Sequence, residues 1–372
     1  DYLSLLELYA GIAHPADLSS TEAIWDYYLQ EFNSALSSWS APFETPPRSA
    51  DQALACMEHK TGTRHALAHE FPQAIRDIAE EFGFHFEREG SSAKIAETDR
   101  FILYQVFPNE KNIEVRNDSK PILIVHPYVL GADILAFLPA DQKSYVHCFA
   151  NQHIPTYVRI LKDITHNPAV QQITLEDDIR DTKHFCEVIR KKHGRPVTLN
   201  GYCQGGLITL ANMLSGELDG LADAHITCVA PIDGTRSPGL GQFLKNLPPR
   251  FNDLAYGTKT LSNGNQVADG DLMSWVYKLK SIREEYPLVA MYRDLSMLEH
   301  FRKKDAPLSK TILALNHWIY HQRHDLPMEI TKLSFASYNT PVTKEGELPF
   351  KAFNQPLNIK RLGEKAIPML IC

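Results

Sequence analysis

The chain has 372 residues and carries 38 lysine and arginine residues against 45 aspartate and glutamate residues, for a formal net charge of -7. This mild acidity gives the protein no long-range attraction to phosphate backbones, so the composition argues against nucleic-acid binding. No apolar run reaches the roughly 18 residues that a membrane-spanning helix needs, so no membrane span is expected. At roughly 100–200 residues per domain, the length predicts two or three structural units.

The cysteines indicate a reduced compartment. No two of them stand in a CxxC pair. In a chain of this length, such usage is typical of a cytoplasmic protein and not of a disulfide-bonded secreted one. We therefore expect a cytoplasmic location. The cysteines are Cys56, Cys148, Cys186, Cys203, Cys228 and Cys372.

The first 95 residues predict a helical N-terminal region. Apolar residues recur at helical spacing over 2–12 and again over 24–32. Ser20 or Thr21 is suited to cap the second of these helices. The other features expected here are a proline-rich linker at 41–48 and a helix over 73–82, with Gly83 just past its end.

Strands and helices then alternate. An amphipathic helix is expected over Leu175–His193, because Thr174 is suited to cap it and Gly194 follows its end. Asp177 lies in its first turn. Alternation of this kind predicts a mostly parallel sheet with helices on both faces. The expected strands are 100–107, 121–126, 144–150, 196–202 and 224–232, and a second helix is expected over 207–214.

The pattern divides the chain into four predicted regions. Residues 1–95 form the helical N-terminal region, and residues 96–235 form the first part of an α/β core. The alternation breaks down over 236–355, where helical, aromatic and proline-containing sequence predicts a cap insertion. Residues 356–372 return to the core, since 366–372 is strand-like, and we expect that core to continue beyond Cys372.

The sharpest motif is Gly201-Tyr202-Cys203-Gln204-Gly205-Gly206, which follows an apolar strand and opens a helix. This is the pattern of a nucleophile elbow, with cysteine in the place more often taken by serine. Gly201 and Gly205 fit, because such a turn packs the residues around the nucleophile so closely that a Cβ would clash. The helix N-terminus favours a thiolate, so Cys203 is predicted to be the catalytic nucleophile. The alternative is a buried cysteine in a tight glycine turn.

A second motif, His126-Pro127-Tyr128-Val129-Leu130-Gly131, comes directly after the strand predicted at 121–126. Enzymes with a nucleophile elbow build the oxyanion hole from the amide after the nucleophile and one amide of the loop after an early strand. The predicted donors are therefore the backbone amide of Gln204 and that of Tyr128 or, alternatively, Val129. A turn made rigid by Pro127 is the other interpretation of this loop.

A nucleophilic thiol needs a base, and the base needs an acid that orients it. Proteins of this fold follow the chain order nucleophile, acid, histidine. Both residues are expected after a late strand, so we expect them beyond Cys372. Asp233 is a candidate for the acid within the chain, although a turn at Asp233-Gly234 alone also accounts for it.

The remaining histidines and cysteines suggest no cofactor. His317, His321 and His324 stand at spacings of four and three, so they could share a helix face that binds zinc. Packed or solvated histidines are commoner than ligands, and neither a metal nor another cofactor is predicted. The cysteines expected in the core, because they lie in apolar runs, are Cys148, Cys186 and Cys228.

Together these motifs resemble the polyhydroxyalkanoate synthases, which carry cysteine where lipases carry serine. The likeness covers roughly residues 95–372 and centres on NGYCQGG, the run around Cys203. The other runs that resemble the family are PILIVHPYVLGADIL, SYVHCFANQHIP, the helix over 175–193, DGDLMSWVYKLK and KAIPMLIC.

The resemblance implies an α/β-hydrolase fold and an acyltransferase. Cys203 would take the acyl chain of a 3-hydroxyacyl-CoA as a thioester, release CoA and pass the chain into a polyester. Two alternatives stay open. One is a hydrolase, either an intracellular polyester depolymerase or an acyl-CoA thioesterase, and the other is a non-catalytic granule-associated relative. The implied partners are 3-hydroxyacyl-CoA or polyester as substrate, a second copy or second subunit, and a granule surface.

Overall fold

The structure is a computed structural model that describes residues 2–40, 50–86, 90–237, 239, 241, 244, 257–274 and 286–372. Contacts divide the chain into two compact units. One comprises Asp1–Glu80 with Trp275–Ile319, and the other comprises Glu81–Ser274 with Tyr320–Cys372. Of the predicted cap at 236–355, residues 275–319 belong to the first unit, whereas 236–274 and 320–355 belong to the second.

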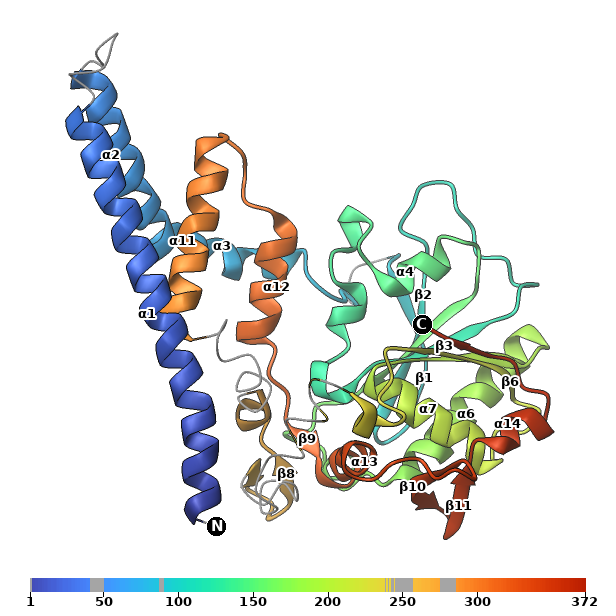
Figure 1. Ribbon diagram of the computed structural model, residues 1–372. Coiled ribbons are helices and arrows are strands. Elements are labelled where there is room, and N and C mark those ends of the chain that lie inside the picture. The colour runs from blue at the N-terminus through green and yellow to red at the C-terminus, as the bar shows by residue number, and fades with distance from the viewer. Residues whose placement is uncertain are drawn as a thin grey trace. The chain divides into compact units, whose positions relative to one another are not determined.

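The first unit consists of helices (Figure 1). Helix α11 (Pro287–Lys303) contacts both α1 (Tyr2–Ser40) and α2 (Ala50–His65). The predicted linker at 41–48 lies outside the described residues. No helix in the described part of the chain combines the length and the apolar character needed to cross a membrane. The other elements of this unit are a π-helical turn (Ala66–Glu70), α3 (Phe71–Asp77), a 3-10 turn (Ile78–Glu80) and α12 (Lys310–His321).

Helix α1 is continuous, whereas the sequence predicts two helices in this region. The Ser20 hydroxyl donates to the Ala16 carbonyl over 2.8 Å, and the Thr21 hydroxyl donates to the Asp17 carbonyl over 2.8 Å. Hydroxyls that bond the carbonyl four residues earlier belong to a helix interior and do not cap a new helix. The helix also runs through Pro15, so the predicted interruption was wrong.

The second unit is built on a seven-stranded sheet. In spatial order its strands are β1 (Ser92–Glu97), β2 (Phe101–Val106), β4 (Thr156–Leu161), β3 (Ile122–Val125), β5 (Val197–Tyr202), β6 (Ala222–Cys228) and β12 (Met369–Ile371). β2 runs antiparallel to both of its neighbours, and all pairs from β4 to β12 are parallel. The helices of this sheet are α4 (Tyr145–Ala150), α5 (Pro168–Gln171), α6 (Leu175–His193) and α7 (Gln204–Ser215).

The layers agree with the predicted mostly parallel sheet. Helices α6 and α7 lie on one face of the sheet and α4 on the other (Figure 1). All four residues of the central strand β3 are buried, as expected for a strand covered on both faces. The strands predicted at 100–107, 121–126 and 196–202 are confirmed as β2, β3 and β5, while the strand predicted at 224–232 ends at Cys228.

The predicted strand over 144–150 was wrong, because these residues form helix α4. The Ser144 side chain caps this helix by accepting from the His147 amide. Val146 and Ala150 are both fully buried, and their spacing of four places them on one face of a helix. The strand in this part of the chain is β4, which the sequence analysis did not predict.

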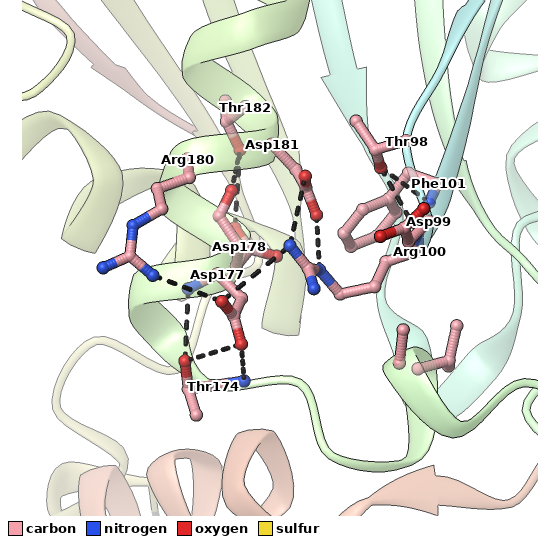
Figure 2. A network of polar contacts seen from close by, with 12 residues as sticks. Thr98, Asp99, Arg100, Phe101, Thr174, Asp177, Asp178, Arg180, Asp181 and Thr182 are labelled. Atoms are coloured by element: carbon pink, nitrogen blue, oxygen red, sulfur yellow. Dashed lines mark hydrogen bonds and ion pairs between the residues drawn. The ribbon is translucent and has the colours of Figure 1, made fainter.

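Helix α6 begins with a capping box and is tied to β2 (Figure 2). The Thr174 side chain accepts from the Asp177 amide, and the Asp177 side chain accepts from the Thr174 amide. Directly before β2, Arg100 Nε donates to Asp181 Oδ2 over 2.7 Å, and its Nη2 lies 3.8 Å from Asp177 Oδ1. Gly194 ends the helix in the left-handed conformation. The helix predicted over 175–193 is thus confirmed with its cap and its end.

Shorter elements follow β6 along the chain. Helix α13 (Met328–Asn339) is the most relevant to the site, because it contacts the turn at 234–236 that follows β6. The others are β7 (Thr258–Thr260), β8 (Gln266–Ala268) and β9 (Leu326–Pro327) in one small sheet, β10 (Glu347–Ala352) and β11 (Gln355–Asn358) in a hairpin, and α14 (Lys360–Glu364).

Candidate active site

Cys203 lies at the sharp turn between β5 and α7. Its backbone has φ 53° and ψ -121°, a combination that L-residues adopt only under strain. Its amide donates to the Cys228 carbonyl over 2.8 Å, and its carbonyl accepts from the Gly206 amide over 2.8 Å. These bonds on both sides hold the cysteine in the strained conformation, which is that of a nucleophile elbow.

Three glycines make this turn possible. A Cβ on Gly201 would lie 2.3 Å from the Gly205 carbonyl oxygen, and a Cβ on Gly205 would lie 2.3 Å from the Val125 carbonyl oxygen. A Cβ on Gly206 would lie 2.4 Å from Thr227 Oγ1. The structure therefore places Gly201 and Gly205 where the sequence analysis required glycine, and it adds Gly206.

The thiol of Cys203 is mostly buried, and this burial disfavours its thiolate. Burial raises its pKa, and the Gln204 amide, which points at the sulfur, opposes that rise. The Tyr338 hydroxyl on α13 lies near enough for a Cys203 thiolate to add to the effect of burial, and the pKa of Tyr338 rises to about 12. Among the described residues, no histidine or carboxylate influences the pKa of this thiol.

The loop after β3 lies against the elbow. Tyr128–Leu130 form a 3-10 turn, and the Val129 amide donates to Gln204 Oε1 over 3.1 Å. Gln204 Nε2 in turn donates to Ser334 Oγ on α13 over 2.7 Å. In this arrangement the Val129 amide already has an acceptor, whereas the Tyr128 amide forms no hydrogen bond with any described residue. Of the two alternatives for the second oxyanion donor, Tyr128 is therefore the one that is available.

The sequence analysis missed Ser334 and Tyr338. Both come from α13, more than a hundred residues after the elbow, and no local pattern announces them. Tyr338 packs so closely on the turn after β6 that a Cβ on Gly234 would lie 2.3 Å from its ring. Helix α13, which the sequence analysis assigned to the predicted cap, thus contacts the elbow through Ser334 and the turn after β6 through Tyr338.

Asp233 takes part in a local turn. Its Oδ1 accepts from Thr235 Oγ1 over 2.5 Å, and its Oδ2 lies 3.1 Å from Arg236 Nε. Both partners stand within three residues, as expected of an aspartate that organises the turn it belongs to. The structure therefore favours the turn interpretation of Asp233 over a catalytic one.

The three histidines of the zinc hypothesis do not share a helix face. Helix α12 ends at His321, so His324 lies beyond it, and His317 Nδ1 lies 3.1 Å from the Ile75 carbonyl. The described ranges contain no group of three or more His, Cys, Asp or Glu side chains that could hold a metal ion. Among the cysteines predicted in the core, Cys186 and Cys228 are buried, but Cys148 is exposed, because its segment is a helix and not a strand.

The strand order and the strained cysteine define the class of protein. A mostly parallel sheet in this order, with its second strand antiparallel and a glycine-flanked nucleophile position after β5, is the α/β-hydrolase fold. The second unit thus has the α/β-hydrolase fold, with cysteine in the nucleophile position. Lipases and esterases of this fold cleave or transfer acyl groups through an acyl-enzyme.

Comparison with known proteins adds no closer assignment. No protein-family model and no curated protein matches the sequence. Among solved structures, the chain is similar to a monoglyceride lipase from Saccharomyces cerevisiae, with 13% identity, a TM-score of 0.33, and coverage of 60% of this chain and 72% of that one. It is also similar to a Bacillus licheniformis lipase in mature form, with 13% identity, a TM-score of 0.30, and coverage of 53% and 70%. Scores this low carry no weight, so the fold rests on the strand order and the elbow.

Proposed function

We propose that this protein is a cysteine acyltransferase that moves 3-hydroxyacyl groups from CoA into a polyester, as its resemblance to the polyhydroxyalkanoate synthases implies. The observation that supports this proposal is Cys203 in a strained elbow with the Gln204 amide aimed at its sulfur. A cysteine in place of the commoner serine suits a thioester substrate, because one thioester is exchanged for another.

The first half-reaction forms the acyl-enzyme. The Cys203 sulfur attacks the thioester carbonyl of the acyl-CoA, its proton passes to a base, and the carbonyl oxygen becomes an oxyanion. The amides of Gln204 and Tyr128 are the proposed donors to that oxyanion. When the tetrahedral intermediate collapses, the C–S bond to CoA breaks and the CoA sulfur takes up a proton. The products are the Cys203 thioester and free CoA.

The second half-reaction decides between a transferase and a hydrolase. In a transferase, the hydroxyl of another 3-hydroxyacyl chain attacks the Cys203 thioester. The hydroxyl proton is removed, an ester bond replaces the C–S bond, and the Cys203 sulfur leaves and takes up a proton. In a hydrolase, water attacks and a free acid leaves. Both share the acyl-enzyme, so the product identifies the activity.

The base is the part of the proposal that no described residue supplies. Because burial raises the pKa of the Cys203 thiol, little thiolate exists at neutral pH, and the proton has to leave during the attack. The resemblance implies a histidine in this role, oriented by an acid. The same proposal places the reaction in the cytoplasm, with a second copy, a second subunit or a granule surface as partner.

The test uses the full-length protein with 3-hydroxybutyryl-CoA. CoA release is followed with a thiol reagent, and the product is analysed for polymer and for free acid. The wild type is compared with Cys203→Ala and with Cys148→Ala, a matched control that removes an exposed cysteine elsewhere. We expect CoA release that Cys203→Ala abolishes and Cys148→Ala leaves intact, with polymer as the product.

Other outcomes point elsewhere. Release that depends on Cys203 but yields only free acid would assign a thioesterase. Release that does not depend on Cys203, or no release at all, would overturn the acyl-CoA proposal. Incubation with preformed polyester would then show whether the protein is a depolymerase or a non-catalytic relative.

A further inference from the structure

A buried ion pair lies beneath the loop that carries Tyr128. Arg159, in the middle of β4, and Asp178, on the first turn of α6, both have fully buried side chains. Arg159 Nη2 donates to Asp178 Oδ2 over 2.9 Å, and Nη1 donates to Asp178 Oδ1 over 3.1 Å. The guanidinium also stacks 4.2 Å from the centre of the Phe101 ring. This is a two-point pairing in the geometry that guanidinium and carboxylate favour.

Arg159 keeps its charge in the folded protein. Burial by itself lowers its pKa, but Asp178, Tyr128 and Asp181 together outweigh that effect, and the pKa is raised. A buried ion pair stabilises a fold little, because the loss of hydration offsets the attraction between the charges. Apolar residues of similar volume often replace such a pair without loss of stability. Stability alone therefore does not account for the pair.

The contacts of the pair suggest its function. The Tyr128 hydroxyl accepts from Arg159 Nη2 over 2.6 Å and donates to Asp178 Oδ2. Burial raises the pKa of Tyr128 well above its usual value, so this hydroxyl keeps its proton as a donor. The Tyr128 side chain is therefore hydrogen-bonded to both Arg159 and Asp178.

The same carboxylate also holds the helix behind the nucleophile. Asn212 Nδ2, on α7, donates to Asp178 Oδ1 over 3.0 Å. Helix α7 starts at the elbow, and Gln204 at its first turn accepts from the Val129 amide. The loop and helix α7 are thus linked at two places. Val129 bonds Gln204 at the start of the helix, and Tyr128 and Asn212 both donate to the Asp178 carboxylate. Around the pair, α6 itself is fixed by Arg100 through Asp177 and Asp181 (Figure 2).

We propose that Arg159 and Asp178 are positioning residues that set the Tyr128 amide relative to the Cys203 sulfur. The inference rests on the proposed acyl-transfer function, which supplies the oxyanion that the amide would stabilise. It goes further by assigning a catalytic purpose to two residues that cannot touch the substrate. A donor displaced by about 1 Å can cost on the order of 100-fold in rate, so such a device has a measurable effect.

The most informative variant is Tyr128→Phe. This variant removes only the hydroxyl that bonds to the pair. It keeps the backbone amide of residue 128, and it keeps the two hydrogen bonds between Arg159 and Asp178. The matched control is Tyr157→Phe. Tyr157 lies on β4, the strand that carries Arg159, is fully buried, and would lose one hydrogen bond, that to His193 Nε2 at 2.7 Å. A purely structural role predicts the same result for both variants.

Three readouts separate positioning from folding. The acylation rate of Cys203 is measured in single turnovers with 3-hydroxybutyryl-CoA, and the alkylation rate of Cys203 with iodoacetamide, which needs no oxyanion donor. Amide hydrogen exchange of 128–131 is measured without substrate. We expect Tyr128→Phe to slow acylation by up to about 100-fold, to leave alkylation unchanged and to speed exchange in the loop. Tyr157→Phe should do none of these.

A second variant guards against a loss of folding. Arg159→Met combined with Asp178→Leu replaces the pair by apolar side chains of comparable size, an exchange that buried ion pairs often tolerate. Made in the Tyr128→Phe background, so that no buried hydroxyl is left without its partners, it should keep the thermal midpoint of Tyr128→Phe and add no further loss of acylation or of loop protection. Unchanged loop exchange in both variants would overturn the inference. If the wild type forms no acyl-enzyme, the proposed function fails, and the exchange data still decide the positioning role.

Discussion

Gly201→Ala tests the elbow at its tightest point. The added Cβ would lie 2.3 Å from the Gly205 carbonyl oxygen and 2.4 Å from Gly206 Cα. Both are backbone atoms of the turn, so neither can move aside as a flexible side chain would. Overpacking in a core typically costs about 1–3 kcal/mol. Because two backbone clashes coincide, we expect a loss near the upper end, about 3 kcal/mol in the free energy of unfolding.

The control for this variant is Gly363→Ala. Gly363 lies in α14, and a Cβ there would meet no atom within 4 Å. Alanine is the better helix former by up to about 1 kcal/mol, so this variant should be neutral or slightly stabilised. Urea denaturation followed by circular dichroism gives the free energies, and alkylation of Cys203 reports whether the sulfur is still presented. A Gly201→Ala protein within about 0.5 kcal/mol of wild type would refute the packing argument.

Two further predictions concern strain and pH. Cys203→Gly should be more stable than Cys203→Ala by about 1–2 kcal/mol, because glycine relieves the strained backbone at φ 53°; equal urea midpoints would show that the turn stores no strain. Burial lowers the pKa of His126, His147 and His225 from 6.5 to about 4. The unfolded state therefore binds more protons than the folded state between these values. As the pH falls from 6.5 to about 4, the free energy of unfolding should therefore decrease by about 1.4 kcal/mol per pH unit for each histidine. His225→Gln should flatten this slope between pH 6.5 and pH 4, and an unchanged slope would mean that His225 is not held neutral.

Local signals in the sequence were enough for several elements. The capping box of Thr174 with Asp177 and the glycine at 194 marked both ends of α6. The elbow was also predictable, because close approach of backbones leaves glycine as the only residue that fits at Gly201 and Gly205. In such cases the determining contacts lie within a few residues along the chain.

The missed features depend on distant partners. Strand β4 carries Arg159 in an otherwise apolar run, and a charge in a central strand is acceptable only because Asp178 on α6 neutralises it. Neither residue indicates this pairing by itself. Ser144 was equally ambiguous, since the role of its side chain as an N-cap decides for a helix over a segment whose apolar residues also suit a strand. Ser334 and Tyr338 of α13 were missed for the same reason, because their partners lie far away along the chain.

The three elbow glycines each face a different neighbour: Gly201 faces α7, Gly205 faces the end of β3, and Gly206 faces Thr227 on β6. The hexapeptide is therefore not a transferable module. To move these six residues to another strand–helix junction, one would also have to supply two neighbours. One is a strand that ends beside Gly205, as β3 does at Val125, and the other is a strand with a small side chain opposite Gly206, as β6 has at Thr227. Conversely, substitutions on β3 or β6 that shift either strand can disable the cysteine without altering any residue of its own turn.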